Sequence, residues 1–200
     1  MNPRVIHRAV LVLLSLGVLS ASVLAAKRLE GIPLVWKPTN RKDNGGLVNL
    51  VGITDVKIQV TPFVDTRADK VKFGENQEDK VPKPVTTSGS VADFCTQHFG
   101  DTLKQLGLTV VAEGGDVVVS AEILEFMVIE TNTYKGEVRL KVSVKRQGET
   151  AWVGLASGTS SRFGRSYRDE NYFETISDSL LDAALRTASD EGFRRALLSR

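Results

Sequence analysis

The sequence contains one cysteine and two histidines in 200 residues, and this scarcity excludes several kinds of site. Cys95 has no partner for an internal disulfide, and no Cys/His cluster has the ligand spacing of a zinc site. Phosphate-binding loops, nucleophile elbows and HExxH motifs are also missing. His98 lies in an apolar helical pattern, which is more typical of a core or boundary residue than of a catalyst. We therefore expect no metal, no cofactor and no enzymatic activity.

The chain also lacks an excess of basic charge once its first residues are set aside. Residues 1–25 contain two arginines and no acidic residue, and the remainder has 24 basic and 24 acidic residues. This balance argues against nucleic-acid binding, which usually needs a strongly basic surface.

Residues 1–25 have the three parts of a secretory signal peptide. Arg4 and Arg8 form a basic start, an apolar run covers residues 9–19, and Ala25 ends a possible cleavage motif. An uncleaved membrane anchor is the alternative, although the apolar stretch is close to the minimum for spanning a bilayer. We expect cleavage, export and no stable membrane span afterwards. The residue directly after the cleavage site is not a cysteine, so we expect a periplasmic protein without a lipid anchor, either free or associated with the outer membrane.

Residues 26–52 are predicted to form an extended or irregular segment, because a proline disfavours helix at the residue before it. Trp36 lies in this segment, and we interpret it as packing along the domain rather than as an exposed anchor for a partner. Residues 53–200 are predicted to form a single domain. Its first strand covers residues 56–64, and Pro62 suggests that this strand leaves the ladder or lies at an edge there.

Residues 67–87 are polar, carry charges of both signs and predict a long loop that is either functional or disordered. A helix follows, opened by Ser90 with Asp93 in an approximate capping box and ended by Gly107. Cys95 lies in the apolar stripe of this helix, so we predict that it is a small buried residue rather than a reactive thiol.

The strongest pattern lies between residues 116 and 165. Val138, Leu140, Val142 and Val144 alternate with polar or charged residues, which is typical of a strand with one buried face. Residues 147–149 supply a turn into the next strand. The pattern predicts three consecutive antiparallel strands, after a short strand at residues 108–112.

A last helix is predicted to start near Asn171, with Glu174 as its capping partner, and to run to about Leu198 with Gly192 as a weak point. The order is strand, helix, four strands, helix. We expect an α+β fold with a mixed, mostly antiparallel sheet of about five strands and two helices on one face.

The connection between the last strand and the last helix is the strongest candidate for a binding surface, since it concentrates arginines and aromatic residues. The competing interpretation is structural, with Phe163 and Phe173 buried, the arginines in ion pairs and Asn171 as a cap. The candidate partner-binding residues, including two that follow the first strand, are Asp65, Arg67, Arg162, Phe163, Arg165, Tyr167, Arg168 and Tyr172.

Three short stretches and the order of elements carry a resemblance. Residues 60–67 (VTPFVDTR), the following FGEN at residues 73–76 and the RFGRSY…ENYF segment resemble YajG-like bacterial envelope lipoproteins over roughly residues 50–198. More loosely, the arrangement is similar to the amino-terminal domain of TolB. The resemblance implies a binding or assembly module without catalytic residues, but the chain departs from it in having no lipidation cysteine.

We therefore predict a non-enzymatic periplasmic or cell-envelope module that engages an envelope protein or a peptidoglycan-associated partner. A homo-oligomer is left open. The alternatives are a carrier of a small ligand or glycan, which needs a concave apolar cavity, and an envelope hydrolase, which needs a polar pocket with perturbed ionisable groups.

Overall fold

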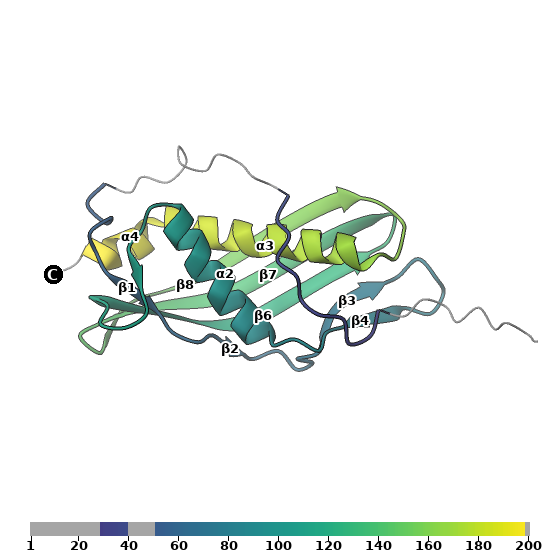
Figure 1. The fold of residues 1–200 in the computed structure, drawn as a ribbon, viewed down its shortest axis with the longest axis horizontal. Helices are drawn as coiled ribbons and strands as arrows, with labels where there is room; N and C mark the ends of the chain where they lie inside the picture. The colour runs from purple at the N-terminus through teal and green to yellow at the C-terminus, as the bar shows by residue number, and fades with distance from the viewer. Residues whose placement is uncertain (1–28, 40–50, 199–200) are drawn as a thin grey trace, which may run out of the picture.

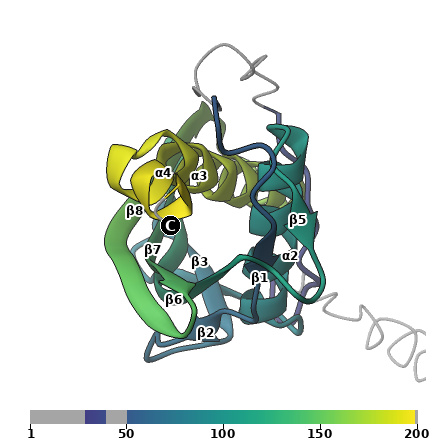
Figure 2. The same cartoon turned by 90° about the vertical axis from the view of Figure 1, so that its left-hand side faces the viewer.

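The computed structural model describes residues 29–39 and 51–198, which form one sheet with helices over one of its faces (Figures 1 and 2). The elements, in chain order, are β1 (Ile58–Val60), β2 (Val64–Asp65), β3 (Lys72–Asn76), β4 (Lys83–Thr86), α2 (Val91–Gln105), β5 (Val110–Val111), β6 (Val117–Glu130), β7 (Thr133–Arg146), β8 (Glu149–Phe163), α3 (Asp169–Ser189) and α4 (Glu191–Leu198). The predicted α+β class is confirmed, although the described part of the chain has eight strands and three helices rather than about five and two.

The three long strands β6, β7 and β8 form an antiparallel unit, as predicted. The alternating valines and leucine of β7 are fully buried, while the charged residues between Lys135 and Lys145 lie exposed on the opposite face. Gln147 and Gly148 both have positive φ, 52° and 86°, which is the conformation of a type I′ hairpin turn. The sequence pattern therefore determined both the faces and the turn of this hairpin.

The other edge of β6 is shared by three short parallel strands in succession, β1, β2 and β3, while β5 lies outside β1 and β4 outside β3. The predicted strand over residues 56–64 is wrong in its length. It breaks into β1 and β2, and Pro62 lies in the break. Proline has no N–H to give to the ladder, so the chain leaves β6 and rejoins it further along.

The long loop predicted at residues 67–87 is also wrong, because this stretch contains the β3–β4 hairpin. Only Phe73 and Val85 supply buried apolar side chains, too few for a recognisable alternation. A Cβ on Gly74 would lie 2.6 Å from the ring of Tyr172, so the strand depends on close contact with α3. The hairpin is therefore stabilised by tertiary packing on β6 and α3 rather than by a hydrophobic pattern in its own sequence.

The first helix, α2, follows the prediction closely. The Ser90 hydroxyl accepts a hydrogen bond from the backbone N–H of Asp93 at 3.1 Å, and Gly107, with φ of 93°, follows the helix end. Cys95 is fully buried, which confirms its predicted place in the core.

The last helix begins earlier than predicted and is interrupted. Arg168 precedes α3 without a side-chain capping bond, so Asn171 is not the cap, and Glu174 instead forms ion pairs with Lys37 and Arg162. The break comes at Asp190, whose carboxylate accepts the backbone N–H of Phe193 at 2.8 Å and so caps α4. The predicted weak point, Gly192, is already inside α4.

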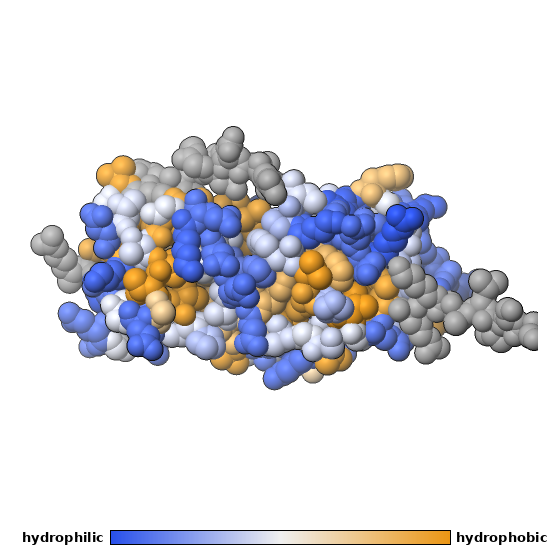
Figure 3. Space-filling view, viewed as in Figure 1, coloured by the Kyte–Doolittle hydropathy of each residue, from blue (hydrophilic) through white to orange (hydrophobic). Residues whose placement is uncertain are grey.

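Residues 29–39 form a strap that crosses the helix side of the molecule (Figure 1). The Trp36 ring stacks on His98 at 4.3 Å between centroids and meets Phe94 edge-on at 5.9 Å, which confirms that Trp36 packs along the domain. Figure 3 shows hydrophilic surface over α2 with apolar surface on either side of it. The expected leader, residues 1–25, lies outside the described residues.

Within residues 29–39 and 51–198, no helix combines the length and apolar character needed to cross a membrane.

Candidate functional site

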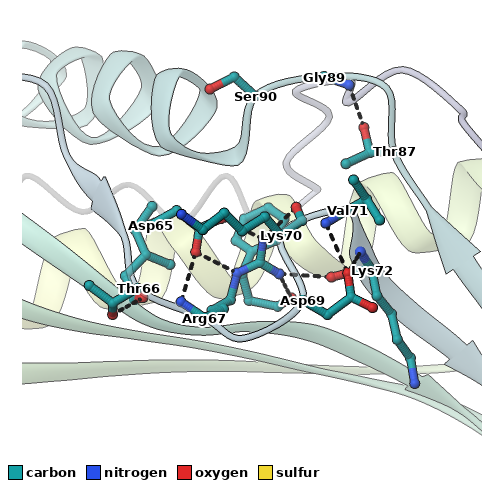
Figure 4. Close-up of polar contacts among 12 residues, drawn as sticks. Asp65, Thr66, Arg67, Asp69, Lys70, Val71, Lys72, Thr87, Gly89 and Ser90 are labelled. Atoms are coloured by element: carbon teal, nitrogen blue, oxygen red, sulfur yellow. Dashed lines mark hydrogen bonds and ion pairs between the residues drawn. The ribbon is translucent and has the colours of Figure 1, made fainter.

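Asp65 and Arg67, two of the predicted binding residues, form an almost completely buried ion pair (Figure 4). Arg67 Nη2 lies 2.7 Å from Asp65 Oδ2 and Nε lies 2.9 Å from Oδ1, so the pair is bidentate. Arg67 also donates to the carbonyls of Lys70, Lys72 and Phe126 at 2.8–3.2 Å. Burial raises the pKa of the Asp65 carboxyl, but hydrogen bonds from Arg67 outweigh this and lower it overall. Arg67 therefore links the β2–β3 turn to β6, and the N–H donors of its guanidinium are all used inside the protein.

A shallow hollow lies beside this turn, between it and the start of α2 (Figure 4). It has a volume of about 430 Å³ and is lined by Phe63, Val64, Asp65, Lys70, Val71, Gly89, Ser90, Val91 and Ala92. Val64 and Val71 are more than half exposed at its rim. The backbone N–H of Asp93 is taken by Ser90, and Asp69 accepts the N–H groups of Val71 and Lys72.

Glu130, at the end of β6, is a buried carboxylate that holds the predicted binding segment in place. Its Oε1 accepts the hydroxyl of Tyr134 at 2.5 Å and the backbone N–H groups of Ser166 and Tyr167 at 3.1 and 2.8 Å. Its Oε2 accepts the hydroxyl of Tyr172 at 2.7 Å. Burial raises the pKa of Glu130, but these hydrogen bonds more than compensate and lower it. A charged carboxylate without solvent exposure is therefore satisfied by several donors.

Tyr172 and Tyr167 are consequently structural members of the predicted segment. Tyr172 is fully buried, and burial together with the nearby Glu130 charge raises the pKa of its hydroxyl far above the ordinary value. Tyr167 has a positive φ of 43°, its N–H is held by Glu130, and its hydroxyl accepts the N–H of Leu29 at 3.3 Å.

Arg162 is also used inside the protein. It forms an ion pair with Glu174, lies 3.8 Å from Asp178 and donates to the Thr39 hydroxyl at 2.7 Å. These contacts tie the end of β8 to α3 and to the strap. They agree with the structural interpretation of this arginine.

The remaining members of the segment face solvent. The Phe163 residue is 89% exposed, which contradicts the structural interpretation in which it is buried; Phe173, by contrast, is buried. The Arg165 side chain is 65% exposed, and its Nε forms a long ion pair with Glu78 Oε1 at 3.6 Å. Arg168 is also exposed. The segment therefore divides into buried anchors and an exposed set of Phe163, Arg165 and Arg168.

A groove lies next to Phe163 on the face of the sheet that the helices leave uncovered. Its volume is about 740 Å³, and it is lined by Glu125, Met127, Ile129, Lys135, Gly136, Glu137, Thr159, Ser160 and Ser161. Phe163 pairs with Thr133, and Ser161 pairs with Lys135, so Phe163 is the next residue of β8 on the same face. We call this area, together with Phe163 and the exposed Arg165 and Arg168 that follow it in the chain, the outer-face site.

Sequence reasoning missed Met127 and Ile129, although a signal was present. Residues 126–129 read Phe-Met-Val-Ile, so β6 carries apolar side chains on both faces here. Phe126 and Val128 are buried beneath the helices, while Met127 and Ile129 are only partly covered. An apolar run within a strand that is otherwise alternating points to a second apolar surface.

The described residues contain no group of three or more His, Cys, Asp or Glu side chains that could hold a metal ion.

No protein-family model and no curated protein sequence matches this chain. Its fold is similar to that of protein XCC0632 from Xanthomonas campestris, of the family DUF330, with a TM-score of 0.50, 8% identity and coverage of 67% of this chain and 82% of that one. It is also similar to the crystal structure of an uncharacterized protein, with a TM-score of 0.51, 9% identity and coverage of 81% and 97% respectively. At these identities the likeness concerns the fold alone.

Proposed function

We propose that this chain is a non-enzymatic binding module of the bacterial cell envelope that captures a protein partner at the outer-face site. The observation that carries the proposal is the exposure of Phe163, an aromatic side chain that lies two residues beyond Ser161 of the groove lining, on the same face of β8, rather than in the core. Large aromatic and arginine side chains are the groups most often responsible for binding energy at protein interfaces.

The spacing of the exposed apolar residues along β8 favours a polypeptide over a small molecule. Val153, Leu155 and Phe163 are 49%, 69% and 89% exposed and lie on the same face, with the polar residues Ser157, Thr159 and Ser161 between Leu155 and Phe163. From Val153 to Phe163 the strand extends roughly 33 Å at 3.3 Å per residue. A drug-sized ligand would cover only part of this row, whereas a partner chain covers all of it.

The charges of the outer-face site also suit a protein partner. Lys135 and Glu137 line the groove, and the exposed Arg165 and Arg168 follow Phe163 in the chain. Arginine can hold a carboxylate through two parallel hydrogen bonds, so the arginine end of the site favours an acidic residue on the partner.

The rigid mounting of the site supports the same proposal. Glu130 holds the backbone of Ser166 and Tyr167, and Arg162 holds the end of β8, so the exposed side chains lie on a preformed surface. Little conformational entropy is then lost on binding. Export to the periplasm by a cleaved leader, with no lipid anchor, completes the proposal.

A carrier of a small apolar ligand is the second candidate, because a groove of about 740 Å³ falls within the size range of ligand sites. The two candidates separate by substitution. Phe163 and Arg165 are not part of the groove lining, so Phe163→Ala and Arg165→Ala should weaken a partner that extends along β8 but not a small ligand bound in the groove beside Met127.

The test is capture of envelope proteins by the purified chain after mild crosslinking, with a thermal melt for each variant. We expect Phe163→Ala and Arg165→Ala each to cost roughly 1–3 kcal/mol of binding without changing the melting temperature. Lys104→Ala, on the exposed surface of α2, is the control and should capture the partner normally. Capture that is unaffected by both site variants would refute the proposal.

A further inference from the structure

Strand β8 is a long free edge of the sheet. It has 15 residues, and within the described parts of the chain it pairs only with β7. The backbone N–H of Thr159 does not face β7 but donates to Asp182 Oδ2 on α3 at 3.0 Å. In an antiparallel ladder, alternate residues direct their N–H and C=O groups to the same side. Val153, Leu155, Ser157 and Ser161 therefore also present their backbone groups to the free edge.

This edge lacks the usual protection against pairing. From Thr150 to Ser161 the sequence contains no charged residue and no proline. Exposed edges are normally blocked by lysine, proline or a bulge, and the register shift in β8 comes only at its start, opposite Lys145. Val153 and Leu155 add exposed apolar surface to the same stretch.

Among residues 29–39 and 51–198, the side chain that occupies a backbone N–H of this edge is Asp182, on α3. Asp182 Oδ2 also accepts from Arg186 Nε at 2.9 Å, and the Arg186 side chain is 61% exposed. Helix α3 runs antiparallel to β8, since Arg162 meets Glu174 and Gly158 lies against Ser179 and Ala183. Asp182 is thus level with Thr159, and Arg186 is displaced along α3 in the direction of Leu155.

We propose that the free edge of β8 pairs with β8 of a second copy of this chain, antiparallel and about a two-fold axis at Ser157. This register places Ser157 opposite its own copy and Leu155 opposite Thr159 of the partner subunit. Each of these opposed residues directs its N–H and C=O outward, so each pair exchanges two main-chain hydrogen bonds. The two sheets become one continuous sheet.

Charge complementarity selects a second copy as the occupant. The two-fold axis exchanges the Thr159 end of one edge with the Leu155 end of the other. The Asp182 side of each subunit therefore faces the Arg186 side of its partner, and the two contacts are reciprocal, as a two-fold interface requires. Thr159 releases its N–H from Asp182 to the partner's strand, and the freed carboxylate turns to Arg186 of the partner subunit.

The test is sedimentation velocity of the full chain over a dilution series that spans the micromolar range. Ser157→Pro removes the two central hydrogen-bond donors while leaving the β7–β8 ladder intact, because this N–H faces the free edge. Ser157→Ala keeps the donor and is the matched control. We expect the parent and Ser157→Ala to reach twice the monomer mass, and Ser157→Pro to raise the dimer Kd at least tenfold.

Two further variants keep the test decisive should Ser157→Pro fold poorly. Leu155→Lys places a charge within the otherwise uncharged stretch from Thr150 to Ser161 and should also abolish the dimer. Arg186→Asp should weaken the dimer through facing acidic residues, and the exchange of Asp182→Arg with Arg186→Asp should restore it. A parent that stays monomeric, or a dimer that survives both Ser157→Pro and Leu155→Lys, would overturn the proposal.

This pairing stands apart from partner capture. Phe163→Ala should reduce capture and leave the dimer intact, whereas Arg186→Asp, on α3 and outside the outer-face site, should weaken the dimer and leave capture intact. A chain that dimerises but captures no partner contradicts the proposed function alone.

Discussion

Glu130 is the residue whose replacement has the most calculable effect on this fold. In Glu130→Gln the side chain keeps its size but loses its charge and one of its two acceptor oxygens. If the amide oxygen occupies the Oε1 position, its NH2 group faces the hydroxyl of Tyr172, which donates to Oε2 in the parent. The Tyr172 oxygen can accept from this NH2 group, but its own O–H then loses the acceptor it has in the parent, in a site without solvent access.

A hydrogen bond to a charged group contributes about 1.5–3 kcal/mol, and a buried donor left unsatisfied costs about 1–3 kcal/mol. We therefore expect Glu130→Gln to lower the free energy of unfolding by about 3 kcal/mol. For a domain of this size that corresponds to a fall of about 6–12 °C in melting temperature.

The assay is urea and thermal unfolding of the parent and Glu130→Gln at several pH values. The pKa of Glu130 is lowered from its ordinary value of 4.5, so its contribution is complete above pH 4.5 and is lost as the pH falls through the folded-state pKa. The stability difference between the two proteins should therefore shrink below pH 4.5.

Glu122→Gln, in an exposed ion pair with Lys141, is the control and should change stability by less than about 0.5 kcal/mol. A Glu130→Gln protein as stable as this control at neutral pH, or a difference that widens with acid, would refute the reasoning.

Four other predictions follow from single positions. Gly158→Ala should destabilise by about 1–3 kcal/mol in urea unfolding, because its Cβ would lie 2.0 Å from the Ser179 carbonyl; an unchanged midpoint would contradict this packing. Cys95→Ser should cost about 1–3 kcal/mol through a buried hydroxyl, and the native thiol, whose pKa burial raises, should resist a bulky thiol reagent; rapid labelling would contradict burial. Asp65→Asn should lower the free energy of unfolding at neutral pH. The stability difference from the parent should shrink as the pH falls below 3.8, because hydrogen bonds from Arg67 lower the pKa of Asp65; a stability difference that does not change with pH would argue against the ion pair. Intact mass of the exported protein should show a chain beginning at Ala26 or Lys27; retention of Met1 or a lipid adduct would count against cleavage or against the unanchored state.

The parts of the fold that follow a strong local period were predictable. The alternation of β7, the turn at Gln147 and the cap at Ser90 are each set by neighbouring residues, and all were confirmed. The β3–β4 hairpin was missed because its strands are stabilised by β6 and Tyr172, which lie far away in sequence. The start of α3 was misplaced because Glu174 is held by Lys37 and Arg162 instead of capping the helix.

The candidate site was predictable only in outline. Composition marked residues 162–172 as unusual, but composition cannot distinguish an arginine that faces solvent from one that holds the fold together. Arg67 lies beside the nearly buried carboxylate of Asp65 and Arg162 beside the buried carboxylate of Asp178, whereas Arg165 has no buried carboxylate beside it among the described residues. The contribution of Met127 and Ile129 was not predicted, because it depends on β6 having one face beneath the helices and a second face that the helices leave open.

Site-specific photocrosslinking at position 163 tests the central claim most directly. A photoreactive phenylalanine in place of Phe163 preserves the ring and lies in the outer-face site, while the same group in place of Lys104 reports on the helix side. We predict a covalent adduct with an envelope protein from position 163 in intact cells, reduced by Arg165→Ala and missing from position 104. Adducts from position 104 alone, or equal adducts from both positions, would contradict binding at the outer-face site.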